Sequence, residues 1–108
     1  MYSPQQLDQR SLALHALAAE KLRRDNFLLV KVRLVLDHWV DVASPRTHGY
    51  LNAWQVAVSE GAEACIALAL EDSESGAAMR QASPLACLLT NRERFDFLKN
   101  WAKHYASQ

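Results

Sequence analysis

The chain has 108 residues, a length that fits one domain and excludes two independent hydrophobic cores. Half of its residues are hydrophobic and only 3 Gly and 3 Pro interrupt it, which excludes a disordered chain and favours a folded helical protein. The 12 Lys and Arg balance the 12 Asp and Glu, but residues 1–34 and 80–108 are basic and residues 35–79 are acidic. Such segregated charge creates local fields that steer binding partners.

The first residues, Met1 to Gln6, lack the basic and then apolar order of a secretory signal. No apolar run approaches the roughly 18 residues of a membrane span. We therefore expect a soluble, cytoplasmic protein that does not enter a membrane. Cys65 and Cys87 lie in apolar surroundings, and in a reducing compartment we expect free thiols rather than a disulfide.

The first two helices are predicted by their caps and apolar spacing. Ser3 followed by Pro4 is typical of a helix start, and the helix should run to Arg24. Its apolar stripe is expected to contain Leu7, Ser11, Leu14, Ala18 and Leu22. A second helix should follow Asp25 or Asn26 and end near Val42, with a stripe of Leu28 or Leu29, Val32, Leu36 and Trp39. Its β-branched residues also suit a strand, but its length favours a helix.

Two further helices are predicted in the middle of the chain. Ser44 and Pro45 repeat the cap and proline, and the next helix should start near Arg46 and end at Gly61. Its buried face is expected to contain Tyr50, Leu51, Trp54, Ala57 and Val58. Residues 62–70 are rich in Ala, Cys, Ile and Leu, which predicts a central helix packed on several sides.

The last third contains a short helix and a long one. After the acidic interruption at residues 71–76, a short helix is predicted from Ala77 to Gln81 or Ala82, and Ser83 and Pro84 end it. Thr90 and Glu93 have the spacing of a capping box that opens a final helix to about Ala106. One face of this helix is expected to carry Phe95, Leu98, Trp101, Ala102 and Tyr105. The prediction is an all-α compact bundle of about five to six helices, forming a single domain over residues 1–108.

Most catalytic and metal-binding motifs are missing. The sequence contains no glycine-rich phosphate loop, no GxSxG, no HExxH and no CxxC. The four histidines are scattered, and no two of them stand at i, i+4. We therefore expect neither a metal site nor a cofactor.

Arg33 and His38 form an Arg-x4-His pair within a small helical chain. The pair resembles the signature of HEPN-type ribonucleases, helical toxins. That resemblance implies that the imidazole handles protons at the ribose 2′-hydroxyl and the guanidinium stabilises the phosphate transition state. The alternative is that Arg33 pairs with Asp37 and His38 is a surface imidazole. We favour the alternative because the spacing recurs at Arg10 and His15, and because no other residue completes an active site.

Two other binding functions are not favoured by the sequence. The acidic residues Glu71, Asp72 and Glu74 lack the alternating oxygen ligands of an EF-hand loop, so we interpret them as a solvated turn. A helix-turn-helix over residues 62–81 would offer only Arg80 and Gln81 to bases, beside an anionic turn that repels phosphate. Nucleic-acid binding is therefore not expected.

The C-terminal third provides the candidate surface for a protein partner. Arg80, Arg92 and Arg94 flank apolar residues such as Leu85. Residues 71–98 resemble a pattern of small bacterial helical proteins: Arg-Gln-x-Ser-Pro, an aromatic and a small residue, then a Leu-Thr cap and Glu-Arg. Here Leu85 replaces the aromatic residue and Cys87 the small one. Some of those proteins are encoded beside toxin-type genes, so the resemblance implies an antitoxin-like role and no catalytic residues.

The sequence thus favours a non-enzymatic interaction module, an antitoxin-like or regulatory subunit that binds and masks a protein partner such as a toxin or a regulator. The ribonuclease that uses Arg33 and His38 is the alternative. A homodimer is compatible with either hypothesis. The residues expected to contact the partner are Arg80, Gln81, Leu85, Arg92, Arg94, Glu71, Asp72 and Glu74.

Overall fold

The computed structural model describes the backbone of residues 2–106 and the side chains of residues 2–104, and every regular element in this part of the chain is helical. The helices are α1 (Pro4–Arg24), α2 (Leu28–Val42), α3 (His48–Glu60), α4 (Ala62–Ala69), α5 (Glu74–Gln81) and α6 (Asn91–Ala106). Two 3-10 turns, η1 (Pro45–Thr47) and η2 (Leu85–Leu88), separate some of them. The predicted all-α fold in one globule is confirmed.

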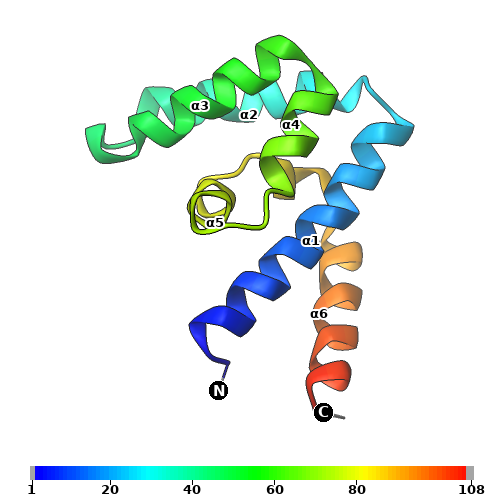
Figure 1. Cartoon of the computed structure of the whole chain (residues 1–108). Helices are drawn as coiled ribbons and strands as arrows, with labels where there is room; N and C mark the ends of the chain where they lie inside the picture. Colours follow the sequence, from blue (N-terminus) through cyan, green and yellow to red (C-terminus); the bar gives the residue numbers. More distant parts are fainter. Residues whose placement is uncertain (1, 107–108) are drawn as a thin grey trace.

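The helices form an upper layer and a lower arm (Figure 1). Helices α2 and α3 lie side by side in the upper layer, and α4 descends from the end of α3. Helix α1 packs against α4, α5 and η2, while α6 runs alongside the lower part of α1. This arrangement places α2 in the upper layer and the C-terminal end of α6 at the lower end of the molecule.

Several helix ends follow directly from the sequence. The Ser3 hydroxyl accepts a hydrogen bond from the Gln6 backbone N–H at 3.1 Å, and the Gln6 side chain accepts one from the Ser3 N–H at 2.7 Å. Gly61 ends α3 with a φ of 119°, a conformation that favours glycine. Two predicted helix ends, the start at Pro4 and the stop at Gly61, are therefore confirmed.

Other boundaries differ from the prediction. Helix α5 begins at Glu74 rather than Ala77, because the Ser73 hydroxyl accepts a hydrogen bond from the Gly76 N–H at 3.0 Å and caps the helix early. Ser44 and Pro45 lead into the 3-10 turn η1, so α3 begins at His48 rather than near Arg46. Ser83 and Pro84 follow the end of α5 as predicted and lead into the second 3-10 turn, η2. A proline at the first position suits either kind of helix, and the sequence alone does not distinguish them.

The core lies where α1, α2, α3, α4 and η2 meet. Its largest member is Trp54, which is 0% exposed and donates a hydrogen bond from Nε1 to the Met79 carbonyl at 2.9 Å. That bond ties α3 to α5. The other buried apolar residues are Ala18, Ala19, Leu22, Val32, Leu36, Leu51, Ala57, Val58, Cys65, Ile66, Ala69, Met79, Leu85, Leu88 and Leu89.

Two residues expected in the core are exposed. Leu7 is 41% exposed and Tyr50 is 44% exposed. Both stand close to the start of a long helix, and each of these helix starts projects past the body of the fold (Figure 1). Helical spacing identifies the inward face of a helix but does not show how far its neighbours extend.

Arg80 is buried and caps the C-terminal end of α4. Its Nη1 donates to the Ala69 carbonyl at 3.0 Å and to the Glu71 carbonyl at 2.7 Å, so a guanidinium satisfies carbonyls left free where α4 ends. Gly76 permits the close approach of this turn, because a Cβ added there would lie 1.9 Å from the Glu71 carbonyl oxygen. The α4–α5 turn is therefore a tightly built part of the fold.

Helix α6 packs against the rest of the fold along only one side. No side chain of α6 that the structure describes is fully buried, and Phe97 and Trp101 are half-buried. The radius of gyration is 14.0 Å, slightly more than the roughly 13 Å expected for a compact chain of this length. The excess agrees with a projecting arm. Within residues 2–106, no helix has both the length and the apolarity needed to cross a membrane.

Candidate functional site

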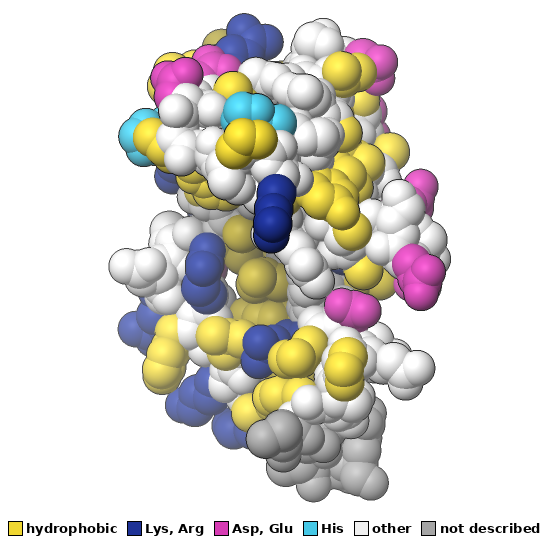
Figure 2. Space-filling model, turned by 90° about the vertical axis from the view of Figure 1, so that its left-hand side faces the viewer, with side chains coloured by type: hydrophobic (Ala, Val, Ile, Leu, Met, Phe, Trp, Pro, Cys, Tyr) yellow, Lys and Arg dark blue, Asp and Glu magenta, His cyan; other side chains and the backbone are white. Residues whose placement is uncertain are grey.

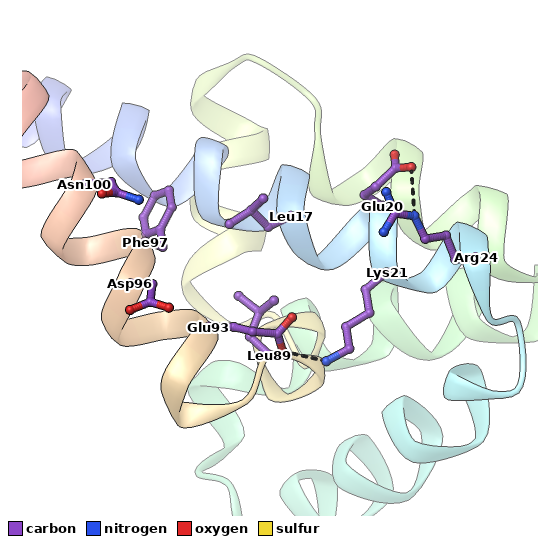
Figure 3. Close-up of a pocket in the computed structure, with 9 residues that line it drawn as sticks. All are labelled: Leu17, Glu20, Lys21, Arg24, Leu89, Glu93, Asp96, Phe97 and Asn100. Atoms are coloured by element: carbon purple, nitrogen blue, oxygen red, sulfur yellow. Dashed lines mark hydrogen bonds and ion pairs between the residues drawn. The ribbon is translucent and has the colours of Figure 1, made fainter.

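A groove of about 630 Å³ runs between α1 and α6 (Figure 3). Leu17, Leu89 and Phe97 form its apolar floor. Leu17 is 45% exposed although it stands next to the buried Ala18, because the arm formed by α6 leaves this part of α1 uncovered. A groove with an apolar floor between two helices suits the apolar face of a third helix.

An ion pair joins the two walls of the groove. Lys21 on α1 donates to Glu93 on α6 at 2.6 Å between Nζ and Oε1 (Figure 3). Glu93 also completes the predicted capping box, since its carboxylate accepts from the Thr90 N–H at 2.8 Å and its own N–H donates to the Thr90 hydroxyl at 3.0 Å. One side chain therefore both starts α6 and attaches it to α1.

These contacts lower the pKa of Glu93 to about 2, first through the Lys21 hydrogen bond and then through the Thr90 N–H. A lowered carboxyl pKa stabilises the fold at neutral pH, and this contribution disappears as the pH falls from about 4.5 to about 2. We expect Glu93→Gln, which can still form the capping box, to lower the thermal unfolding midpoint at pH 7. The difference from the wild type should vanish near pH 2.

Far-UV circular dichroism of both proteins between pH 7 and pH 2 measures this difference. Lys21→Met should reduce the midpoint at pH 7 and lose its effect over the same pH range, because it removes the same ion pair. A difference between wild type and Glu93→Gln that stays constant down to pH 2 would contradict the role assigned to the Glu93 charge.

The remaining charges at the rim are paired within their own helices. Glu20 lies 3.7 Å from Arg23 and 3.6 Å from Arg24 on α1. On α6, Arg92 Nε lies 3.2 Å from Asp96 Oδ2. Both acidic residues of α6 are thus neutralised by cations of this chain. The basic residues Arg94, Lys99 and Lys103 then leave α6 with a positive surface.

The side of α6 that faces away from the groove is also apolar. Phe95 is 62% exposed and Leu98 is 39% exposed. They belong to the apolar face predicted from the sequence, and so does Trp101, which stacks with Phe97 at a ring-centroid distance of 6.1 Å. Of the predicted face, the side chain of Tyr105 lies outside the described residues. A helix with apolar residues on so much of its circumference exposes apolar surface to water, which is unfavourable unless another chain covers it.

Three of the predicted partner-binding residues are exposed near α6 or at the end of α5. Arg92 and Arg94 lie in the first turn of α6, and the Arg94 Nη2 donates to the Ala86 carbonyl at 2.9 Å. Gln81 is exposed at the end of α5. Arg92 adjoins the groove through its ion pair with Asp96.

Two of the predicted partner-binding residues lie inside the protein. Arg80 is 5% exposed, and Leu85 is 0% exposed. The guanidinium of Arg80 is used to cap α4, and Leu85 belongs to the core as the first residue of η2. Their assignment to a partner-binding surface is wrong for this conformation.

The acidic residues form a separate surface. Glu71, Asp72 and Glu74 are exposed on the α4–α5 turn. Asp72 and Glu74 line a hollow of about 300 Å³ against the first half of α1, where Asp8 adds a third carboxylate and Arg80 is the one cation among the lining residues. Among the described residues, no three His, Cys, Asp or Glu side chains are placed to hold a metal ion. The hollow therefore adds negative charge away from the groove.

Arg33 and His38 do not converge. Helix α2 is continuous from Leu28 to Val42, so side chains five residues apart point about 140° from each other. Arg33 lines two shallow hollows, one beside Val30 near the start of α2 and one between α2 and α3. His38 lines neither of them. The expected ion pair between Arg33 and Asp37 is also absent within the described residues.

The two cysteines are free thiols, and burial raises the pKa of Cys65 to about 11 and also raises that of Cys87. Thiols with raised pKa values are poor nucleophiles. Burial also lowers the pKa of His15, whose Nδ1 lies 2.8 Å from the Ser11 carbonyl oxygen. These groups contribute to the interior rather than to a reactive site.

No protein-family model, curated protein or solved structure matches the chain. None of Leu17, Lys21 and Phe97 was predicted to be a site residue. A signal for Phe97 was available, because it stands four residues before Trp101 and predicts a second apolar side of the last helix.

Proposed function

We propose that this protein is a non-catalytic interaction module, a regulatory or antitoxin-like subunit that binds a protein partner in the groove between α1 and α6. The observation that carries the proposal is the exposed apolar floor, with Leu17 45% exposed between walls joined by the Lys21–Glu93 ion pair. A concave surface formed by exposed apolar residues is typical of a site that another chain covers.

The charge distribution supports a partner with an acidic and apolar helix. Figure 2 shows Lys and Arg side chains gathered on the lower half of one face, which contains the α1–α6 end of the molecule. Asp and Glu occupy the upper half and the right edge, and hydrophobic side chains are recessed between the two regions. Opposite charges speed encounter with a complementary partner and fix its orientation, while the apolar floor supplies most of the affinity.

The test is a binding measurement on the partner that co-purifies with the full chain from its native host. Leu17→Asp places a charge on the groove floor and should weaken that complex at least about tenfold, the equivalent of 1.4 kcal/mol. Val56→Asp is the matched control, because Val56 is 57% exposed on α3, away from the groove. Isothermal titration calorimetry with the purified partner measures all three affinities.

Both variants change exposed positions, so circular dichroism should show the same helix content in each. The proposal fails if Leu17→Asp binds as tightly as the wild type, or if Val56→Asp weakens the complex as much as Leu17→Asp does. Loss of binding only in Leu17→Asp would support the groove as the site.

A further inference from the structure

Helix α2 is apolar on two opposite sides. Its inner side carries Val32 and Leu36, which are 0% and 1% exposed in the core. Its outer side carries Phe27, which immediately precedes the helix, together with Val30 and Leu34; they are 86%, 59% and 65% exposed. A helix that is apolar on both sides is typical of one packed on both sides.

The outer side of α2 faces away from the rest of the described chain. Helix α2 packs on α3 and η2 with its inner side and forms the back of the upper layer (Figure 1). The three outer residues stand at spacings of three and four, so they form one continuous stripe. The most exposed large apolar side chain among the described residues, Phe27, lies in this stripe.

Charges along one flank of the stripe are arranged so that a second α2 would complement them. Arg33 and Asp37 line the same shallow hollow between α2 and α3, so they lie on the same flank. Within the described part of the chain neither side chain forms an ion pair. A second α2 running in the opposite direction brings its Asp37 to Arg33 and its Arg33 to Asp37. A parallel two-fold copy would place this flank on opposite sides of the seam and leave both charges without a partner.

The same antiparallel register also pairs the apolar residues. When Arg33 stands opposite Asp37 of a second copy, the two Leu34 side chains meet near the centre. Phe27 then reaches Val42 of the second copy at the far end, and Val42 is 67% exposed in the single chain. The α2 helix is about 22 Å long at 1.5 Å per residue. One register therefore brings together Leu34, Phe27 and Val42 and pairs Arg33 with Asp37. The exposed side chains of Lys31, His38 and Asp41 lie beside these residues on α2.

We propose that two copies of this chain associate through the outer side of α2 in an antiparallel, two-fold symmetric dimer. A two-fold interface uses the same patch on both copies, which the reciprocal Arg33 and Asp37 pairs require. The interface and the partner groove use different residues, since none of Phe27, Val30 and Leu34 lines the groove. A dimer of this form leaves both grooves open and is bivalent. A single pair of helices buries less than a standard interface, so we expect micromolar dissociation.

Sedimentation equilibrium of the full chain between about 1 and 500 µM spans the dissociation constant expected for so small an interface. The wild type should move from 12.2 kDa toward twice that mass. Leu34→Glu should raise the dissociation constant at least about tenfold, while Val56→Glu, an exposed valine on α3, should leave it unchanged. Circular dichroism should show that both variants keep their helix content.

Charge exchange tests the direction of the helices. Arg33→Glu and Asp37→Arg should each weaken the dimer, and the double variant, or an equal mixture of the two single variants, should restore it. A wild type that stays monomeric at 500 µM, a Leu34→Glu variant that dimerises normally, or a double variant no better than the singles would overturn the proposal. None of these outcomes depends on the α1–α6 groove.

Discussion

Replacing Trp54 with alanine is expected to lower the free energy of unfolding by about 3–5 kcal/mol. The ring is 0% exposed between α3 and the rest of the core, and its loss leaves a large cavity. The Met79 carbonyl also loses the hydrogen bond from Nε1. Domains of this size are stable by about 5–15 kcal/mol, so the loss is a large fraction of the total stability. Urea denaturation followed by far-UV circular dichroism measures the change.

Two control variants separate the causes of that loss. Trp54→Phe retains most of the apolar volume but not the N–H group, so it should be clearly milder than Trp54→Ala. Glu74→Ala changes an exposed residue in the first turn of α5 and should cost under about 0.5 kcal/mol. Equal losses in Trp54→Ala and Glu74→Ala would show that the helical register of α3 is wrong.

Replacing Arg80 with alanine is expected to cost about 2–4 kcal/mol, because a charge-assisted hydrogen bond contributes more than a neutral one and an unpaired buried carbonyl is unfavourable. Its guanidinium donates to both the Ala69 and the Glu71 carbonyls. Both would lose their donor in a region where Gly76 already approaches the Glu71 carbonyl closely. Urea denaturation should show a lower midpoint with the same slope.

Arg92→Ala is the matched control, since the Arg92 side chain is 84% exposed and pairs only with Asp96 among the described residues. An exposed pair of this kind contributes little, so its loss should cost less than about 1 kcal/mol. Arg80→Lys keeps the charge but not the planar donor group, and we expect an intermediate loss. An Arg80→Ala variant as stable as Arg92→Ala would contradict the capping role.

The helix ends were predictable where one residue determines them locally. Gly61 ends α3 because its φ of 119° suits only glycine, and the Thr90 and Glu93 box opens α6 within a single turn. The start of α5 was predicted too late, because Ser73 and Glu74 were interpreted as part of an acidic loop. The Ser73 hydroxyl caps the helix early, and Arg80 binds the carbonyl of Glu71 in the turn before it.

The candidate site was less predictable because it depends on how two distant helices cross. The sequence marks Arg80 as one more cation of a basic segment, and only the tertiary structure shows that it points at the end of α4. The groove likewise requires α1 and α6, whose contacting residues Lys21 and Glu93 are 72 positions apart. The segregation of charge along the chain was informative, since both basic ends belong to this neighbouring pair of helices.

The shallow attachment of α6 makes it the element expected to separate first from the folded body. Local opening is easiest where few apolar contacts are buried, and amide hydrogen exchange in such a segment proceeds without global unfolding. Only molecules with α6 docked have a complete groove, so under the proposed function the apparent affinity for a partner is reduced by the undocked fraction. Mutations that tighten the attachment of α6 would therefore strengthen partner binding without touching the partner.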